Sequence, residues 1–102
     1  MRNENSRYAL PITNYKKPMH DLMAAQEILR KALEVAREKK LKKITKIVVE
    51  LGTVIDHDEE ITEENISFNL KNLAKGTLAE EAEVVVQKVS GNHYALTEME
   101  GD

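Results

Sequence analysis

Three adjacent residues, Met19, His20 and Asp21, place an imidazole beside a carboxylate at the start of an amphipathic segment. A neutral imidazole is a good ligand for nickel, copper and zinc. The first backbone N–H groups of a helix have no partner within that helix, so polar groups gather readily there. The triplet could therefore form a small site for a borderline transition metal. The alternative is that His20 and Asp21 only begin the helix.

A second histidine, His57, is surrounded by acidic residues in the stretch 56–60. One imidazole among carboxylates could hold a divalent ion weakly, but so charged a loop is more often simply solvated, and we favour that interpretation. Elsewhere no nucleophile is paired with a base at a recognisable spacing. The four glycines do not form a phosphate-binding loop. We therefore do not expect an enzyme.

The composition excludes several classes of protein. A chain of 102 residues is sufficient for one domain. It has no cysteine, which removes disulfides and every zinc site built on Cys pairs. The net charge is -3 and there are only four aromatic residues, so no basic face interleaved with aromatics predicts nucleic-acid binding. No apolar run is long enough to cross a membrane, and residues 1–17 lack the core of a secretory signal, so a cytoplasmic protein is expected.

Hydrophobic periodicity predicts five elements. Apolar residues at three-and-four spacing indicate a helix over 21–39, and β-branched residues indicate strands over 44–51 and 82–89. The segment 93–99 alternates weakly and is predicted as a third strand. Between them, the alternation of Ile66, Phe68 and Leu70 competes with a helical pattern. Thr62 as an N-cap and Gly76 as a C-terminal glycine favour the helix.

These elements predict an α+β domain in which two helices pack on a small mixed three-stranded sheet, in the order α-β-α-β-β. The strand–helix–strand unit should be parallel, with a right-handed crossover. A turn at 90–92 should join the last two strands as an antiparallel hairpin. Residues 1–18 contain both prolines and are predicted to be an N-terminal arm, extended or disordered. The domain itself is predicted to span residues 19–102.

Several short motifs together resemble one family. The start Met19-His20-Asp21-Leu22, followed by Ala25-Gln26-Glu27, is similar to the Met-His-Glu-Leu-x-x-Ala-Gln start of the HypA hydrogenase/urease nickel-incorporation proteins. The strand end at 50–52, the stretches 73–80 and 82–84, and the C-terminal segment 90–100 resemble later parts of that family in the same order. The resemblance covers the chain, with gaps, from Met19 to its end.

The resemblance implies that the His20 ring, the Asp21 carboxylate and backbone nitrogen near Met19 bind Ni(II). It also implies delivery of nickel to a GTPase or to a target metalloenzyme such as a hydrogenase. The family carries a zinc lobe with two Cys-x-x-Cys pairs between its last strands. Here Val89 runs directly into Ser90, so no zinc is expected.

The position of the triplet leaves two interpretations open. In the family, methionine and histidine open the chain, and a free terminal amine is then available. If translation starts at Met1, the Met19 nitrogen is an amide after Pro18 and therefore a poorer ligand. If translation starts at Met19, this nitrogen is a free amine and the full set of ligands is present. The first hypothesis is a nickel metallochaperone relative, and the alternative is a metal-free protein-interaction module with the same fold. The partner and the oligomeric state stay open.

Overall fold

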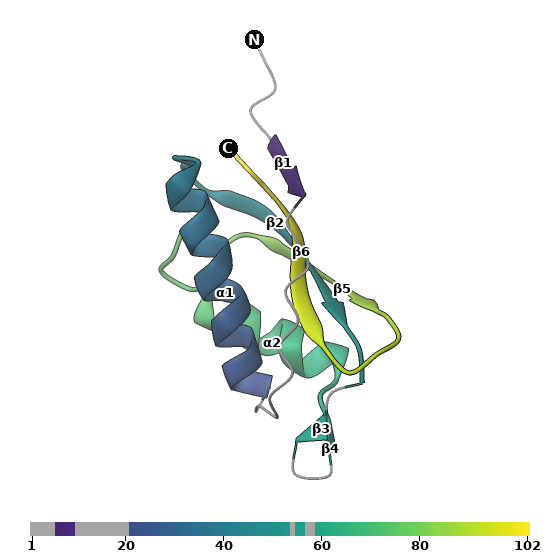
Figure 1. Cartoon of the computed structure of the whole chain (residues 1–102). Helices are drawn as coiled ribbons and strands as arrows, with labels where there is room; N and C mark the ends of the chain where they lie inside the picture. Colours follow the sequence, from purple (N-terminus) through teal and green to yellow (C-terminus); the bar gives the residue numbers. More distant parts are fainter. Residues whose placement is uncertain (1–5, 10–20, 54, 57–58) are drawn as a thin grey trace.

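The computed structural model describes residues 6–9, 21–53, 55–56 and 59–102 (Figure 1). Two helices and six strands lie in these ranges. In chain order they are β1 (Ser6–Ala9), α1 (Asp21–Glu38), β2 (Ile44–Leu51), β3 (Ile55–Asp56), β4 (Glu59–Glu60), α2 (Glu63–Leu73), β5 (Glu83–Lys88) and β6 (Tyr94–Gly101).

The main sheet has the strand order β1-β6-β2-β5. Strands β2 and β5 are parallel, whereas β6 is antiparallel to both of its neighbours, β2 and β1. The predicted α+β class is confirmed, with two helices on the mixed sheet formed by β6, β2 and β5. Strand β1, from the segment predicted to be an arm, adds a fourth strand at the β6 edge. Strands β3 and β4 form a separate two-stranded pair.

The prediction that the last two strands form a hairpin is wrong, because β2 lies between β5 and β6. The connection after β5 passes across the end of β2 instead. Gly52 donates a backbone hydrogen bond to the His93 carbonyl, and Thr53 donates one to the Gly91 carbonyl, each at 2.7 Å. The reason is burial: five of the eight residues of β2 are buried, including Val48 on the far face at 6% exposed, whereas no residue of β5 is buried. The more buried of these two strands therefore takes the central place, and β5 takes the edge.

The final strand alternates only weakly in sequence because it contains a bulge. Val48 pairs with Glu98, but Val49 pairs with Leu96, which leaves Thr97 as an extra residue in β6. An inserted residue shifts the following side chains to the other face. Met99 therefore joins Leu96 in the core and is fully buried, whereas strict alternation without the bulge would place it on the opposite face.

The two helices cover one face of the sheet, with α1 lying against β6 and α2 against β5 (Figure 1). The buried residues of α1 largely follow three-and-four spacing, whereas Leu22 in its first turn is 44% exposed. The buried side chains of α1 are those of Ala24, Ala25, Ile28, Leu29, Ala32, Val35 and Ala36.

The ends of both helices have local causes. The Thr62 side chain accepts a hydrogen bond from the Asn65 N–H at 3.1 Å, which confirms the N-cap of α2 and the choice of a helix over a strand. At the other end of the α2 segment, Gly76 has a φ of +80°. Helix α1 ends where Lys40 adopts a left-handed conformation, and the Leu41 N–H then bonds back to the Ala36 carbonyl at 2.9 Å.

Substitutions on opposite faces of the helices should separate core from surface. Changing Leu29 or Leu70 to Ala should lower the free energy of unfolding by about 2–5 kcal/mol, because each removes buried methyl groups and leaves a cavity. Changing the exposed Glu38 to Ala should cost less than about 0.5 kcal/mol. Urea denaturation measures all three. Equal losses would contradict the assignment of the helix faces.

Gly52 should not tolerate even a methyl group. A Cβ at this position would lie 2.3 Å from the Gly91 carbonyl oxygen, which is backbone and cannot rotate away. We expect Gly52→Ala to cost about 1–3 kcal/mol, the usual range for overpacking. The control is Ser90→Ala in the same connection, because Ser90 is exposed. A Gly52→Ala protein that melts at the wild-type temperature would contradict the close approach of the two segments.

Candidate metal site at the start of α1

The start of α1 is held firmly by the core. Ala24 and Ala25, on its first turn and a half, are completely buried. Their neighbours Leu22 and Met23 are 44% and 43% exposed. The helix therefore presents its first turn at the surface while its inner side is anchored, and in Figure 1 this end lies away from the C-terminus of the chain. A ligand bound here would be accessible to a partner protein.

The metal ligands suggested by the sequence lie at the margin of what the structure describes. Asp21 is the first residue of α1, as the sequence predicts, but only its backbone is described. Met19 and His20 lie outside the described residues. The contribution of the fold is electrostatic: the first N–H groups of a helix carry partial positive charge, which stabilises a carboxylate at that end.

The acidic loop around His57 is attached to the sheet through β4. The Lys88 ammonium lies 2.9 Å from the Glu60 carboxylate and also donates a hydrogen bond to the Gly52 carbonyl at 3.2 Å. Glu60 is thus already paired with a cation, which makes it a poor metal ligand. His57 and Asp58 lie outside the described residues, so the role of this loop stays a prediction.

Among the described residues, no group of three or more His, Cys, Asp or Glu side chains could hold a metal ion. His93, the one histidine in these ranges, is half-buried at the end of the connection that crosses β2. No helix in the described part of the chain is long and apolar enough to cross a membrane. The described residues thus add no further candidate metal site to those that the sequence suggests.

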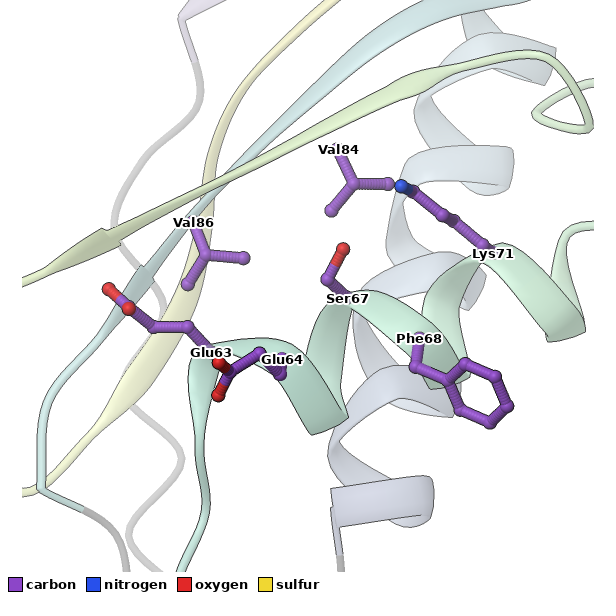
Figure 2. Close-up of a pocket in the computed structure, with 7 residues that line it drawn as sticks. All are labelled: Glu63, Glu64, Ser67, Phe68, Lys71, Val84 and Val86. Atoms are coloured by element: carbon purple, nitrogen blue, oxygen red, sulfur yellow. The ribbon is translucent and has the colours of Figure 1, made fainter.

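A groove between α2 and β5 is a surface feature that the sequence did not predict (Figure 2). It has a volume of about 410 Å³. Figure 2 shows Val84 and Val86 pointing from β5 toward Ser67 on α2. The one residue in the sequence that could have predicted this groove is Phe68. It does not fit the apolar stripe of α2, and it is 65% exposed beside the groove.

Comparison with known proteins decides the family. The family model described as "Hydrogenase/urease nickel incorporation, metallochaperone, hypA" matches residues 19–95. The chain belongs to the HypA family. The match begins at Met19, the first residue of the triplet. The family is described as a metallochaperone, which agrees with the expectation that the chain is not an enzyme.

The chain is similar to hydrogenase maturation factors HypA from archaea. It is 41% identical to that of Thermococcus onnurineus over 66 residues, which are 65% of this chain and 45% of the relative. It is 36% identical to that of Pyrococcus abyssi over 70 residues, 69% of this chain and 48% of the relative. The matched part is thus about half the length of each of these HypA proteins.

The fold is also similar to that of a solved HypA structure. The solution structure of the Ni metallochaperone HypA from Helicobacter pylori superposes with a TM-score of 0.52 and 14% sequence identity. The superposition covers 76% of this chain and 70% of that one. At such low identity the likeness supports the HypA fold and carries no information on individual side chains.

Proposed function

We propose that this HypA family member binds Ni(II) at the start of α1 and passes it on during maturation of a nickel enzyme such as a hydrogenase. The observation that carries the proposal is that the family match begins at Met19, with the Met-His-Asp triplet itself. The ligands would be the His20 imidazole, the Asp21 carboxylate and the Met19 backbone nitrogen. A square-planar set of nitrogen and oxygen donors suits Ni(II).

The fold supports this role in two ways. Burial of Ala24 and Ala25 fixes the direction in which α1 begins, so the ligands next to it would have a rigid base. The neighbouring exposed side chains of Leu22 and Met23 offer an apolar contact beside the metal. A nickel-delivery GTPase or the target metalloenzyme could dock there and take over the ion. Such a role is consistent with a cytoplasmic protein that needs no zinc.

Nickel titration tests the ligand set. The full chain should bind one Ni(II), His20→Ala should abolish binding, and Asp21→Ala should weaken it, because each removes a donor atom. His57→Ala is the matched control and should leave the affinity unchanged. Isothermal titration gives stoichiometry and affinity for each protein. If His57→Ala abolishes binding and His20→Ala does not, the site lies in the acidic loop and the proposed ligands are wrong.

The Met19 nitrogen can be tested separately with a chain that begins at Met19. This chain offers a free amine, whereas the full chain offers an amide after Pro18. The shorter chain should therefore bind Ni(II) more tightly. Its advantage should increase as pH rises through the amine pKa of about 7.7–8.0, because only the unprotonated amine binds metal. If neither chain binds nickel, the metal-free interaction module replaces the metallochaperone as the function.

A further inference from the structure

Strand β1 pairs with β6 at the end of the main sheet, and β6 is its only neighbour among the described strands (Figure 1). The pairing is antiparallel and runs from Ser6 opposite Gly101 to Ala9 opposite Glu98. The family match begins at Met19, so β1 lies before the part of the chain that matches the family model. The edge of β6 therefore already accepts an extended segment that the family match does not include.

The direction of the hydrogen-bonding groups along β6 follows from the residue after its end. Asp102 donates a backbone hydrogen bond to the Lys43 carbonyl at 3.0 Å and accepts one from the Lys42 N–H at 2.7 Å. Its backbone groups thus point to the β2 side of the sheet. Because successive residues of a strand direct these groups to opposite sides, those of Gly101 and Met99 point toward β1. The bulge in β6 lies before this stretch and leaves the alternation intact.

The register transfers this alternation to β1. Tyr8 lies opposite Met99, and Ser6 lies opposite Gly101. Tyr8 and Ser6 are therefore the residues of β1 whose backbone groups face β6, whereas the N–H of Arg7 between them points away from the sheet. Proline has no N–H and is tolerated only where that group would face solvent. A proline at position 8 should break the pairing, and a proline at position 7 should not.

The register also brings two opposite charges together. Arg7 lies opposite Glu100 of β6. The Glu100 carboxylate lies 3.9 Å from the Lys46 ammonium, a long distance for an ion pair, and its side chain is still 20% exposed. Opposite charges on directly opposed residues of two strands stabilise their pairing. A segment that binds this edge should therefore carry a cation opposite Glu100, as β1 does.

We propose that the β6 edge is a binding site for an extended segment of a partner protein, and that β1 occupies this site in cis until such a segment replaces it. The partner segment would add as an antiparallel strand, with free N–H groups opposite Met99 and Gly101 and a cation opposite Glu100. A strand of four residues that pairs on one side is suited to this exchange, because few hydrogen bonds must break at once. The exchange does not depend on nickel binding.

Two proline variants of the full chain test how β1 is held. Tyr8→Pro should release β1, and Arg7→Pro is the matched control that should keep it. Amide hydrogen exchange followed by NMR measures the release: the Met99 N–H should lose protection in Tyr8→Pro and keep it in Arg7→Pro and in the wild type. Retained protection of the Val49 N–H in the central strand shows that each variant is folded. A folded Tyr8→Pro protein in which Met99 stays protected would overturn the proposal.

The same measurement on the wild type distinguishes occupation in cis from occupation by a second copy. Protection of the Met99 N–H should be independent of protein concentration, because the strand belongs to the same chain. Protection that falls on dilution would show that the strand comes from another copy and would refute occupation in cis.

A fluorescent synthetic peptide with the sequence of residues 3–12 tests the site itself. It should bind the Tyr8→Pro protein at least about tenfold more tightly than the wild type or Arg7→Pro, where the tethered β1 competes at a high effective concentration. A peptide with an N-methyl group on Tyr8 should not bind, whereas N-methylation of Arg7 should leave the affinity unchanged. Fluorescence anisotropy gives the affinities. No binding to Tyr8→Pro, or equal binding to all three proteins, would rule out an exchangeable strand.

The charge requirement is tested on the same peptide. Arg7→Glu in the peptide would set two carboxylates opposite each other and should weaken binding to the Tyr8→Pro protein about threefold or more. Arg7→Lys in the peptide is the matched control and should retain the affinity, because it keeps the cation. Equal affinities of the three peptides would contradict a site that selects a cation opposite Glu100.

Discussion

The burial of β2 at the centre of the sheet is the constraint on which the rest of the structure depends. Its inner side chains, Ile47, Val49 and Leu51, pack under the helices, while Val48 is buried on the far face. The backbone N–H and C=O groups of a buried strand need partners on both edges, and β5 and β6 provide them. The two partners run in opposite directions, so the sheet is mixed. The crossover helix α2 is then carried to the same face as α1.

This central position explains two irregularities that would otherwise look unrelated. The connection between β5 and β6 must cross the end of β2, and Gly52 provides the space because any side chain would collide with Gly91. The bulge at Thr97 then turns Met99 back toward the core, so that β6 follows the whole length of β2. Both features adapt the surrounding chain to one buried strand.

Two surface features depend on the core in different ways. At the start of α1, buried alanines hold the helix while its first turn stays accessible, as the proposed nickel site requires. The groove at β5 exists because the sheet ends there and α2 only half-covers Val84 and Val86.

The sequence determined the local elements and the family. Periodicity located both helices and the strands β2, β5 and β6 to within a few residues, and the Thr62 cap decided α2 correctly. The spacing of short motifs from Met19 onward identified the HypA family, because such motifs are local in the chain. The candidate ligands were likewise identified as residue types, whereas Met19 and His20 lie outside the described residues.

Tertiary structure alone decided which strands are neighbours. Residues 90–92 read as a hairpin turn, but a turn sequence specifies a change of direction and not the strand that is reached. Which strands lie beside β2 depends on the total burial of apolar side chains from several segments of the chain. A local sequence pattern does not contain this information. The same holds for Met99, whose face depends on a bulge opposite Val48 and Val49. It also holds for the β5 groove, which exists only once α2 lies against the edge of the sheet.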